Sequence, residues 1–368
     1  MSQCRPRVLM LSVRADHGGG PEHLLQLTRA LGRDCDVFIA CPRELPYWPR
    51  FEAAVGSGRM LELPHRALTV AAVAAVIRLI RDQRIGIVHG HGRGAGIYAR
   101  LAALITGRAC MHTYHGLFYR DYPQPKRLIA LTIEALLGRL TAATIAVSAG
   151  EAELARGWRL TAPSALVTIP NGVVIPPPPG GQRPSAPYPV VMMTRFNHQK
   201  RTDFIFPIME ELRRLGRLDD FRFVVLGDGG ERPALLSRCR DQGWDRWLRM
   251  PGAVDDPAPH LDAAFAYLST SRVEGLPLSL LEALAHGVPV VATDVVGNRD
   301  ILAQGPVGFG YGLDDCAAAA GHLVALADDP ELWRRTSESA RAVAETTYSV
   351  GRMAAEVLTL YRRLARMD

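Results

Sequence analysis

The sequence predicts an α/β protein made of two doubly wound parallel-sheet domains in tandem. Strand-like runs alternate with helix-like runs along most of the chain, which is the pattern of βαβ units. A proline-rich stretch near the middle of the 368 residues interrupts this alternation, which then starts again. A chain of this length is long for one core and sufficient for two domains that each bury an interior.

The first half of the chain supplies the elements of the first predicted domain, residues 1–176. Short apolar runs rich in β-branched residues predict strands, and they cover 7–13, 35–41, 85–91, 109–114, 144–147 and 165–169. Longer runs with helical spacing of apolar residues predict helices, and they cover 21–31, 69–83, 94–105 and 126–140. Because strands and helices take turns, we expect a parallel sheet covered by helices on both faces.

Residues 177–189 are predicted to be an exposed linker. From Ile175 to Pro189 the chain contains seven prolines together with Gly180 and Gly181, and such a composition does not build regular structure.

The second predicted domain covers residues 190–349. Its first strands are expected at 190–194 and 221–226 and its first helices at 203–215 and 231–242. A last helix, at about 350–368, follows after the second sheet is complete.

The charge of the chain is unevenly distributed. The net charge is +6, but residues 1–180 carry 21 Lys+Arg against 12 Asp+Glu, and residues 181–368 carry 22 against 25. A basic first half predicts an anionic partner, such as an acidic membrane surface, a lipid diphosphate or an acidic polysaccharide. Nucleic acid is not expected, because the chain has no basic run of five and no nucleic-acid module signature. All but two of the 43 basic residues are arginine, so compositional bias also contributes.

The sequence lacks the patterns of a membrane span, of a signal peptide and of a metal site. No apolar run approaches the roughly 20 residues that cross a bilayer, and the first fifteen residues carry no signal-peptide pattern. We therefore expect a cytoplasmic protein, with a place at the inner face of the cell membrane as a possibility. The six cysteines lack metal-ligand spacing, and no carboxylate or cysteine accompanies the histidines at 89, 91, 112 and 115 to complete a metal site.

The run from Ser271 to Asp294 is the most informative part of the chain. Pro277 stands where a helix begins, apolar residues follow at helical spacing, and Gly287 ends the helix before a β-branched run. The free N–H groups at such a helix start attract anions, phosphate above all.

Two carboxylates flank this helix start. Helical side chains lean toward the N-terminus, so Glu282, inside the helix, can reach back and accept hydrogen bonds from a ribose diol. Glu274, in the preceding loop, can do the same for sugar hydroxyls. A nucleotide sugar fits this arrangement, because hydroxyls lie on both sides of its diphosphate. Two ordinary solvated carboxylates are the alternative.

The spacing of Glu274 and Glu282 resembles the E-x7-E signature of retaining glycosyltransferases of the GT-B fold, glycosyltransferase family 4 in particular. Other segments resemble the family in the same order along essentially the whole chain. They are Gly18-Gly19-Gly20, Val147-Ser148, Ile169-Pro170-Asn171-Gly172-Val173, the run from Arg195 to Lys200, and Val225-Leu226-Gly227-Asp228-Gly229.

The resemblance implies a fold and an activity. The expected fold is GT-B, two Rossmann-like domains facing across a cleft, with the C-terminal helix packed back on the first domain. The expected activity is retaining transfer of a sugar from a UDP- or GDP-sugar to a hydroxyl acceptor, which is lipid-linked or a polysaccharide, in cell-surface polysaccharide or glycolipid synthesis. No metal or other cofactor is expected.

The resemblance also implies site residues. Arg195 and Lys200 lie five apart in a loop after a strand, and two cations there can neutralise a diphosphate leaving group. We expect His115 to contact the transferred sugar and Glu274 its hydroxyls, which completes the catalytic set. The residues expected to bind the donor are Gly19, Gly20, Gly227, Val254, Leu276, Leu278, Ser279 and Glu282. Solvated loop cations and a hydrogen-bonded core histidine are the alternatives for this set.

Other functions remain open at this stage. A sugar phosphorylase would need a pyridoxal lysine, and the chain has only Lys126 and Lys200. A nucleotide-sugar epimerase and a noncatalytic nucleotide-sugar or polysaccharide-binding protein share the architecture. A dehydrogenase is disfavoured because no complete G-x-G-x-x-G fingerprint follows the first strand. The helix at 125–140 has an apolar stripe flanked by basic residues, which is more often buried but can rest on a membrane.

Overall fold

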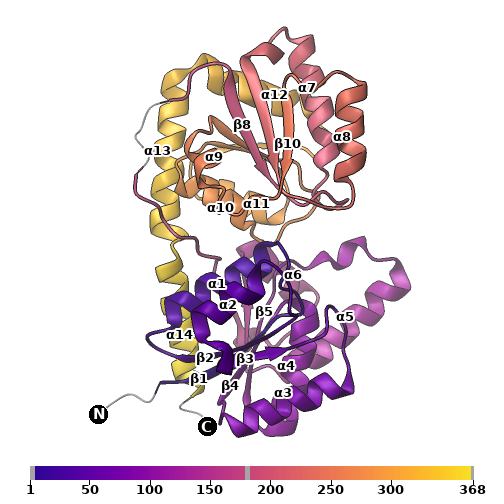
Figure 1. The fold of residues 1–368 in the computed structure, drawn as a ribbon, viewed down its shortest axis with the longest axis vertical. Coiled ribbons are helices and arrows are strands. Elements are labelled where there is room, and N and C mark those ends of the chain that lie inside the picture. The colour runs from indigo at the N-terminus through magenta and orange to yellow at the C-terminus, as the bar shows by residue number, and fades with distance from the viewer. Residues whose placement is uncertain (1–4, 179–182, 366–368) are drawn as a thin grey trace. The chain divides into compact units, whose positions relative to one another are not determined.

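The computed structural model describes residues 5–178 and 183–365. The chain divides into two compact units (Figure 1). Unit 1 comprises Met1–Gly172 with Val350–Asp368, and unit 2 comprises Val173–Ser349. Each unit contains one parallel sheet with helices between its strands, which confirms the predicted α/β class.

Unit 1 is built on a seven-stranded sheet in the order β3-β2-β1-β4-β5-β6-β7. Every recorded strand pair in it is parallel. Its strands are β1 Arg7–Leu11, β2 Asp36–Cys41, β3 Met60–Glu62, β4 Ile87–His91, β5 Ala109–Thr113, β6 Ala143–Ala146 and β7 Leu166–Thr168. Its helices are α1 Gly19–Leu31, α2 Tyr47–Val55, α3 Val70–Asp82, α4 Gly92–Thr106, α5 Gln124–Gly138, α6 Ala149–Gly157 and α14 Val350–Leu364.

The two faces of this sheet contribute to two separate cores, because successive strand residues point to opposite sides. On β1, Val8 and Met10 belong to a cluster with residues of α1, α2 and α14. Leu9 and Leu11, between and after them, belong to a cluster with residues of α3 and α4. The continuous apolar strand therefore reflects burial on both faces.

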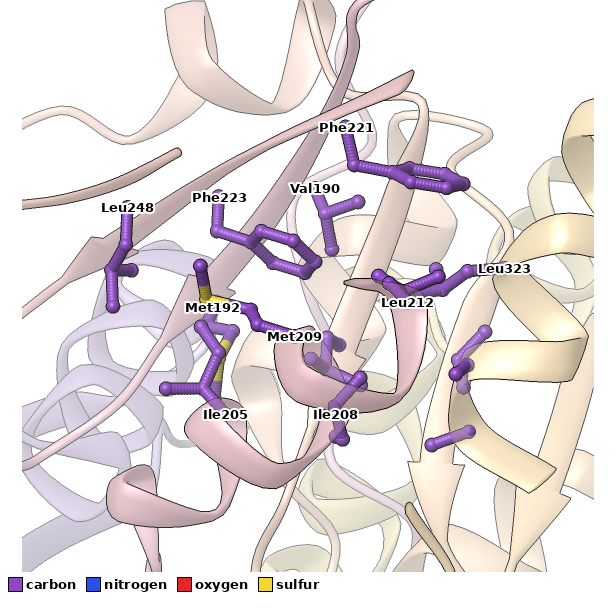
Figure 2. Close-up of a cluster of buried hydrophobic side chains, with 14 of the residues drawn as sticks. Val190, Met192, Ile205, Ile208, Met209, Leu212, Phe221, Phe223, Leu248 and Leu323 are labelled. Carbon is purple, nitrogen blue, oxygen red and sulfur yellow. The ribbon is translucent and has the colours of Figure 1, made fainter. Parts of the chain in front are cut away.

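Unit 2 is built on a six-stranded parallel sheet in the order β10-β9-β8-β11-β12-β13. Its strands are β8 Tyr188–Met193, β9 Phe221–Leu226, β10 Leu248–Gly252, β11 Ala266–Ser269, β12 Val290–Thr293 and β13 Gly308–Tyr311. Its helices are α7 Ile205–Arg214, α8 Arg232–Asp241, α9 Ala258–Asp262, α10 Leu278–Ala285, α11 Val296–Leu302, α12 Cys316–Asp328 and α13 Pro330–Thr347. Figure 2 shows how Ile205, Ile208 and Leu212 of α7 pack on the apolar side chains of β8 and β9.

The segment before unit 2's sheet differs in detail from the predicted linker. Residues 179–182, including Gly180 and Gly181, lie outside the described part of the chain. The first strand begins at Tyr188 and not at Val190, so the last two residues of the predicted linker are in β8. Pro189 is tolerated there because it lies near the start of the strand, and its carbonyl accepts a hydrogen bond from Phe265 N at 2.8 Å.

Helices α14 and α5 both belong to unit 1 and differ in how they pack. Helix α14 returns to unit 1, where Met353, Val357 and Tyr361 join the core on the α1 side of the sheet. Helix α5 forms where a helix was expected, but its apolar stripe faces outward. The prediction that this stripe is buried, which is the more common arrangement, is therefore wrong. The side of α5 that faces the protein interior contains the buried Glu134.

Candidate functional site

The loop after β8 in unit 2 carries the two predicted cations. Asn197 shapes it, because Lys200 N donates to both the backbone oxygen and the Oδ1 of Asn197, at 3.0 and 3.1 Å. Phe196 is fully buried and anchors the loop to the core. Arg195, next to it, is partly exposed. The loop is therefore fixed by the buried side chain of Phe196 and by the hydrogen bonds between Asn197 and Lys200.

Lys200 and Glu274 meet in this unit. The Nζ of Lys200 lies 2.5 Å from Oε1 of Glu274, and the two side chains are 20% and 8% exposed. They come from loops 74 positions apart in the sequence. A charge-assisted hydrogen bond of this kind is stronger than a neutral one, and the low exposure keeps water from screening it.

Hydrogen bonds between neighbouring loops hold this pair in place. Thr270 Oγ1 donates to the Lys200 carbonyl at 3.0 Å, and Arg272 N donates to the Gln199 carbonyl at 2.8 Å. On the other side, Thr293 Oγ1 donates to the Ser271 carbonyl at 2.6 Å. The loops after β8 and β11 and the end of β12 are therefore tied together at one edge of the sheet.

A small cavity lies at this edge. Its lining residues come from β8, β11 and the loops that follow them, together with the first turn of α10: Met192, Met193, Thr194, Lys200, Tyr267, Leu268, Ser269, Thr270, Ser271, Glu274 and Ser279. Since ligands of doubly wound sheets bind outside the carboxyl ends of the strands, the cavity is where such a fold places a ligand.

The predicted donor-binding residues around α10 fall into two groups. Ser279 lines the cavity, and Glu282 lies one turn further along the helix, partly exposed. Leu276 and Leu278 are each only 5% exposed. Their side chains belong to the protein interior, so only their backbone groups are available to a ligand. In the first turn of α10, Leu280 N donates to the Pro277 carbonyl at 3.1 Å, and the N–H groups before it have no acceptor within the helix.

Gly227 lies where a larger residue would clash with the neighbouring backbone. It follows β9 with φ +129°, and a Cβ there would lie 1.8 Å from the Thr194 carbonyl oxygen. The loops after β8 and β9 therefore need this close backbone approach. Val254 follows β10 and is partly exposed. Neither residue lines the cavity that holds Lys200, Glu274 and Ser279, nor does Arg195 or Glu282.

Tyr267 is a residue of this site that sequence reasoning missed. It is 2% exposed, and its hydroxyl donates to the Met193 carbonyl at 3.0 Å and accepts from Met193 N at 3.2 Å. Burial raises the pKa of this phenol well above its ordinary value. A tyrosine in an otherwise apolar strand is the signal that could have found it, because a buried hydroxyl needs a partner.

Unit 1 gathers histidines at the carboxyl ends of β4 and β5. The rings of His23 and His115 meet edge to face with centroids 4.7 Å apart, and those of His91 and His115 stack at 5.6 Å. The Nδ1 of His91 lies 3.4 Å from the Nε2 of His115. His115 is thus in a histidine cluster, and the half-buried position leaves one part of it accessible.

Two further histidines belong to the core. His89 bonds through Nδ1 to the Tyr361 hydroxyl at 2.7 Å and through Nε2 to the Thr113 hydroxyl at 2.8 Å. His112 is fully buried and lies with Nδ1 3.1 Å from the Gly90 carbonyl oxygen. His112 therefore packs within the sheet.

Burial keeps these imidazoles neutral. It lowers the pKa of His23 to about 4 and that of His89 to about 3, and a hydrogen bond with Asn171 opposes the shift of His23 only in part. The pKa values of His91, His112 and His115 are well below 6.5, first through burial and then through the proximity of the other imidazoles and, for His112, of the Arg100 guanidinium. The cluster therefore offers hydrogen-bond donors and acceptors without charge at neutral pH.

Three histidines of unit 1 lie close enough together that one metal ion could bind all three. One ring nitrogen each of His23, His91 and His115 lies within 4.8 Å of the others, and no second such group occurs among residues 5–178 and 183–365. The neutral form is the one that ligates metals. The grouping was not expected, because His23 lies far from the other two in the sequence.

The predicted glycines Gly19 and Gly20 begin α1, one turn before His23. A Cβ on Gly20 would meet no atom within 4 Å, so space beside this helix start is open. Because His23 belongs both to α1 and to the histidine cluster, the start of this helix lies near the cluster.

Glu151 is a second residue that sequence reasoning missed. It is 1% exposed, and its carboxylate accepts from Gly116 N at 2.6 Å and from Val147 N at 2.8 Å. It thereby fixes the turn that follows His115. The signal was available, because Ser148 and Glu151 have the spacing of a capping box, and Ser148 Oγ accepts from Glu151 N at 3.1 Å.

Comparisons with known families and proteins agree with this architecture. The family model for Glycosyltransferase Family 4 matches residues 17–175, and that for Glycosyl transferases group 1 matches residues 188–329. The chain is 27% identical to a phosphatidyl-myo-inositol mannosyltransferase of Mycobacterium leprae, over 95% of this chain and 94% of the relative. It is 25% identical to an Escherichia coli UDP-Gal:alpha-D-GlcNAc-diphosphoundecaprenol alpha-1,3-galactosyltransferase, over 71% of each.

Solved structures share the fold. HepE of Anabaena, in complex with UDP and glucose, superimposes with a TM-score of 0.81 at 15% identity, over 96% of this chain and 99% of that one. A glycosyltransferase of Rickettsia africae superimposes with a TM-score of 0.82 at 17% identity, over 99% and 100%. The predicted GT-B fold is confirmed.

Proposed function

As this chain belongs to the group 1 glycosyltransferases of family 4, we propose that it is a retaining, metal-independent hexosyltransferase that uses a UDP- or GDP-sugar. The acceptor is a hydroxyl group, lipid-linked or on a polysaccharide, in the synthesis of a cell-surface polysaccharide or glycolipid. The chain's assignment as a glycosyltransferase that uses a nucleotide sugar is supported by the family and by the named relatives.

The observation that carries the proposal is the ion pair between Lys200 and Glu274. It joins a cation suited to a diphosphate with a carboxylate suited to sugar hydroxyls at 2.5 Å. The two groups a nucleotide sugar presents at its reacting end are a diphosphate and a hydroxylated ring. A pair of opposite charges in one cavity suits both, whereas a plain nucleotide would need only the cation.

In the proposed mechanism the bond between the anomeric carbon and the diphosphate oxygen breaks first, giving an oxocarbenium-like sugar. Lys200 and Arg195 stabilise the negative charge that develops on the leaving oxygen. That oxygen takes the proton of the acceptor hydroxyl, and the acceptor oxygen bonds to the anomeric carbon on the face the diphosphate left. The configuration is retained without a nucleophile from the enzyme, and the nucleoside diphosphate leaves with the proton.

The remaining residues hold the donor in this proposal. Glu282 accepts hydrogen bonds from the ribose diol, and the first turn of α10, where Ser279 lies, donates N–H groups to the diphosphate. The neutral His115 hydrogen-bonds a hydroxyl of the transferred sugar. Because Lys200 and Arg195 supply positive charge, no metal ion is required to neutralise the diphosphate.

A lipid-linked acceptor is supported by the named relatives, one acting on phosphatidyl-myo-inositol and one on a diphosphoundecaprenol. Within residues 5–178 and 183–365, no helix combines the length and apolar character that crossing a membrane requires. On the basis of these relatives we propose contact with a membrane surface, and we propose no nucleic acid as a partner.

The test begins with donor binding. The folded chain is heated with a panel of nucleoside diphosphates and their sugars, and a true donor raises the melting temperature because it binds only the folded state. The donor found is then incubated with lipid extracts and polysaccharide acceptors, and the anomer of the product is assigned by NMR. An inverted product contradicts retention. Binding without transfer to any acceptor favours the noncatalytic alternative.

A variant pair tests the site itself. Glu274→Gln keeps the size of the side chain and removes its charge, and we expect turnover to fall about 100-fold, in the range of a lost transition-state contact. Glu210→Gln, on an exposed side chain of the same unit, is the matched control and should leave turnover unchanged. Equal activity of the two variants would remove Glu274 from the site.

A further inference from the structure

Helix α5 of unit 1 presents an apolar face outward. The side chains on this face recur at helical spacing, so they lie along one side of the helix and its C-terminal extension. They are Leu128, Ile129, Ile133, Leu136 and Leu140, which are 67%, 60%, 43%, 54% and 41% exposed. These five residues are called the α5 face below. An ordinary surface helix has the opposite arrangement, with its apolar side inward.

The inner side of α5 explains why the helix does not rotate to bury that face. Glu134 is 2% exposed and accepts from Arg100 Nη2 of α4 at 2.7 Å. Arg100 is itself fully buried, and its Nε donates to Thr141 Oγ1 at 2.9 Å. Rotation would leave a buried guanidinium without its carboxylate, and an unpaired buried charge is strongly destabilising.

Gly138 fixes the same orientation by shape. A Cβ at this position would lie 1.8 Å from the Leu160 carbonyl oxygen, so the last turn of α5 sits directly on the backbone before β7. The α5 face is therefore outward because both the polar and the backbone contacts of the helix are on the other side.

Helix α4 also carries exposed apolar side chains near its end. Arg100 joins α4 to the C-terminal part of α5, and one turn beyond it Leu104 and Ile105 are 60% and 54% exposed. Two adjacent helices thus both end in exposed apolar side chains.

The sequence around α5 is basic. Residues 83–150 contain eight Lys+Arg and two Asp+Glu, a net charge of +6 that equals the net charge of the whole chain. One of the two acids is Glu134, which is buried and paired. Lys126 and Arg139, at the two ends of α5, are exposed. At the first end, Lys126 Nζ lies 4.7 Å from the ring centroid of Tyr122.

We infer that the α5 face, with Leu104 and Ile105, docks unit 1 on a bilayer that contains anionic lipid. Exposed apolar side chains bordered by cations and an aromatic ring are the composition of an interfacial helix. The basic border attracts anionic headgroups. A second copy of the chain is a poorer occupant, because each copy would bring the same positive charge to the interface.

This inference extends the proposed function by naming the partner of unit 1. The two can fail separately, because binding to vesicles needs no sugar donor and transfer to a water-soluble acceptor needs no membrane.

The test is flotation of the full chain with vesicles. We expect binding to vesicles of phosphatidylcholine mixed with phosphatidylglycerol, little binding to phosphatidylcholine alone, and release by high salt, which screens charge. The double variant Ile129→Gln/Leu136→Gln should lower the partition coefficient about tenfold or more, because two buried apolar contacts are lost. Lys126→Gln/Arg139→Gln should lower it only for the anionic vesicles.

Control variants distinguish a specific role of the α5 face from the general effect of removing exposed apolar side chains. Leu215→Gln/Leu313→Gln removes two exposed leucines of unit 2, 42% and 38% exposed, and should bind vesicles like the unaltered chain. All variants should keep their melting temperature and their transfer to a water-soluble acceptor. Equal binding of the α5 variant and the unaltered chain overturns the inference. So does a dimer in sedimentation velocity that the α5 variant converts to monomer.

Discussion

The two candidate sites lie at the same place in two similar sheets and have opposite electrostatic character. In unit 2 a lysine and a glutamate meet as ions at 2.5 Å. In unit 1 histidines gather whose pKa values burial has lowered, so that they are neutral. The unit with the higher net charge thus has the uncharged site.

This difference teaches that the net charge of a domain does not report the chemistry of its site. A diphosphate needs fixed positive charge, and unit 2 supplies it although its half of the chain is mildly acidic. A sugar or acceptor hydroxyl needs neutral hydrogen-bond partners, and unit 1 supplies those. The following experiments test whether the division is real.

The largest effect is expected from Lys200→Ala. Loss of the cation should lower kcat/KM about 100- to 1,000-fold, as for other groups that stabilise developing charge. Steady-state kinetics with the identified donor and a water-soluble acceptor measure this. Lys126→Ala, the other lysine of the chain, is the control and should keep full activity. If Lys200→Ala also keeps it, unit 2 has no essential charged site.

A smaller effect is expected from His115→Ala. A neutral hydrogen bond to the transferred sugar is worth about 0.5–1.5 kcal/mol, so kcat/KM should fall about two- to tenfold. A donor that lacks the contacted hydroxyl should lose no further activity in this variant. Should the loss reach that of Lys200→Ala, His115 acts as more than a hydrogen-bond partner, and the contrast between the units weakens.

The stability of unit 1 should depend on pH in a defined direction. The histidines have an unfolded pKa near 6.5 and lower folded values, about 4 for His23 and about 3 for His89. Between these values the unfolded state binds more protons, so the free energy of unfolding falls as the pH drops from 6.5 toward 4. Each histidine adds a slope of up to about 1.4 kcal/mol per pH unit.

Urea unfolding at pH 7, 6 and 5, monitored by a probe in unit 1, measures this slope. His23→Gln should make it shallower, while His17→Gln, on an exposed side chain, should not change it. A stability that stays constant down to pH 5 would show that the cluster is not neutral in the folded protein.

The smallest effect is expected from metal removal. Dialysis against EDTA should leave turnover unchanged, because the proposed transfer uses Lys200 and Arg195 in place of a metal ion. Activity that is lost with EDTA and restored by zinc would instead assign a metal to His23, His91 and His115. In that case unit 1 would also contain a charged site.

Local sequence patterns were sufficient to predict much of this molecule. The alternation of strands and helices predicted both sheets, because burial on two faces demands continuous apolar strands. The E-x7-E spacing placed Glu274 in a loop and Glu282 on the next helix, where the structure has them. Helix starts and glycine turns depend on a few adjacent residues, so a motif can specify them.

Long-range contacts were not predictable in the same way. Tyr267 bonds to the backbone of Met193 and Glu151 to that of Gly116, and no local pattern connects either pair. Gly227 was expected to serve the donor, and the structure adds a close approach to Thr194 that only the packing of two loops creates.

The amino-acid sequence by itself determined the fold class, the order of the elements and the residue types at the sheet edges, since these follow from periodicity and local backbone preference. Tertiary structure alone decided which of those residues meet. Lys200 reaches Glu274 across 74 positions, His23 joins His91 and His115, and Arg100 turns the polar side of α5 inward. The physical reason is that pairing of buried charges and close backbone contacts depend on where distant segments pack, and these contacts outweigh the preference of a single helix for burying its leucines.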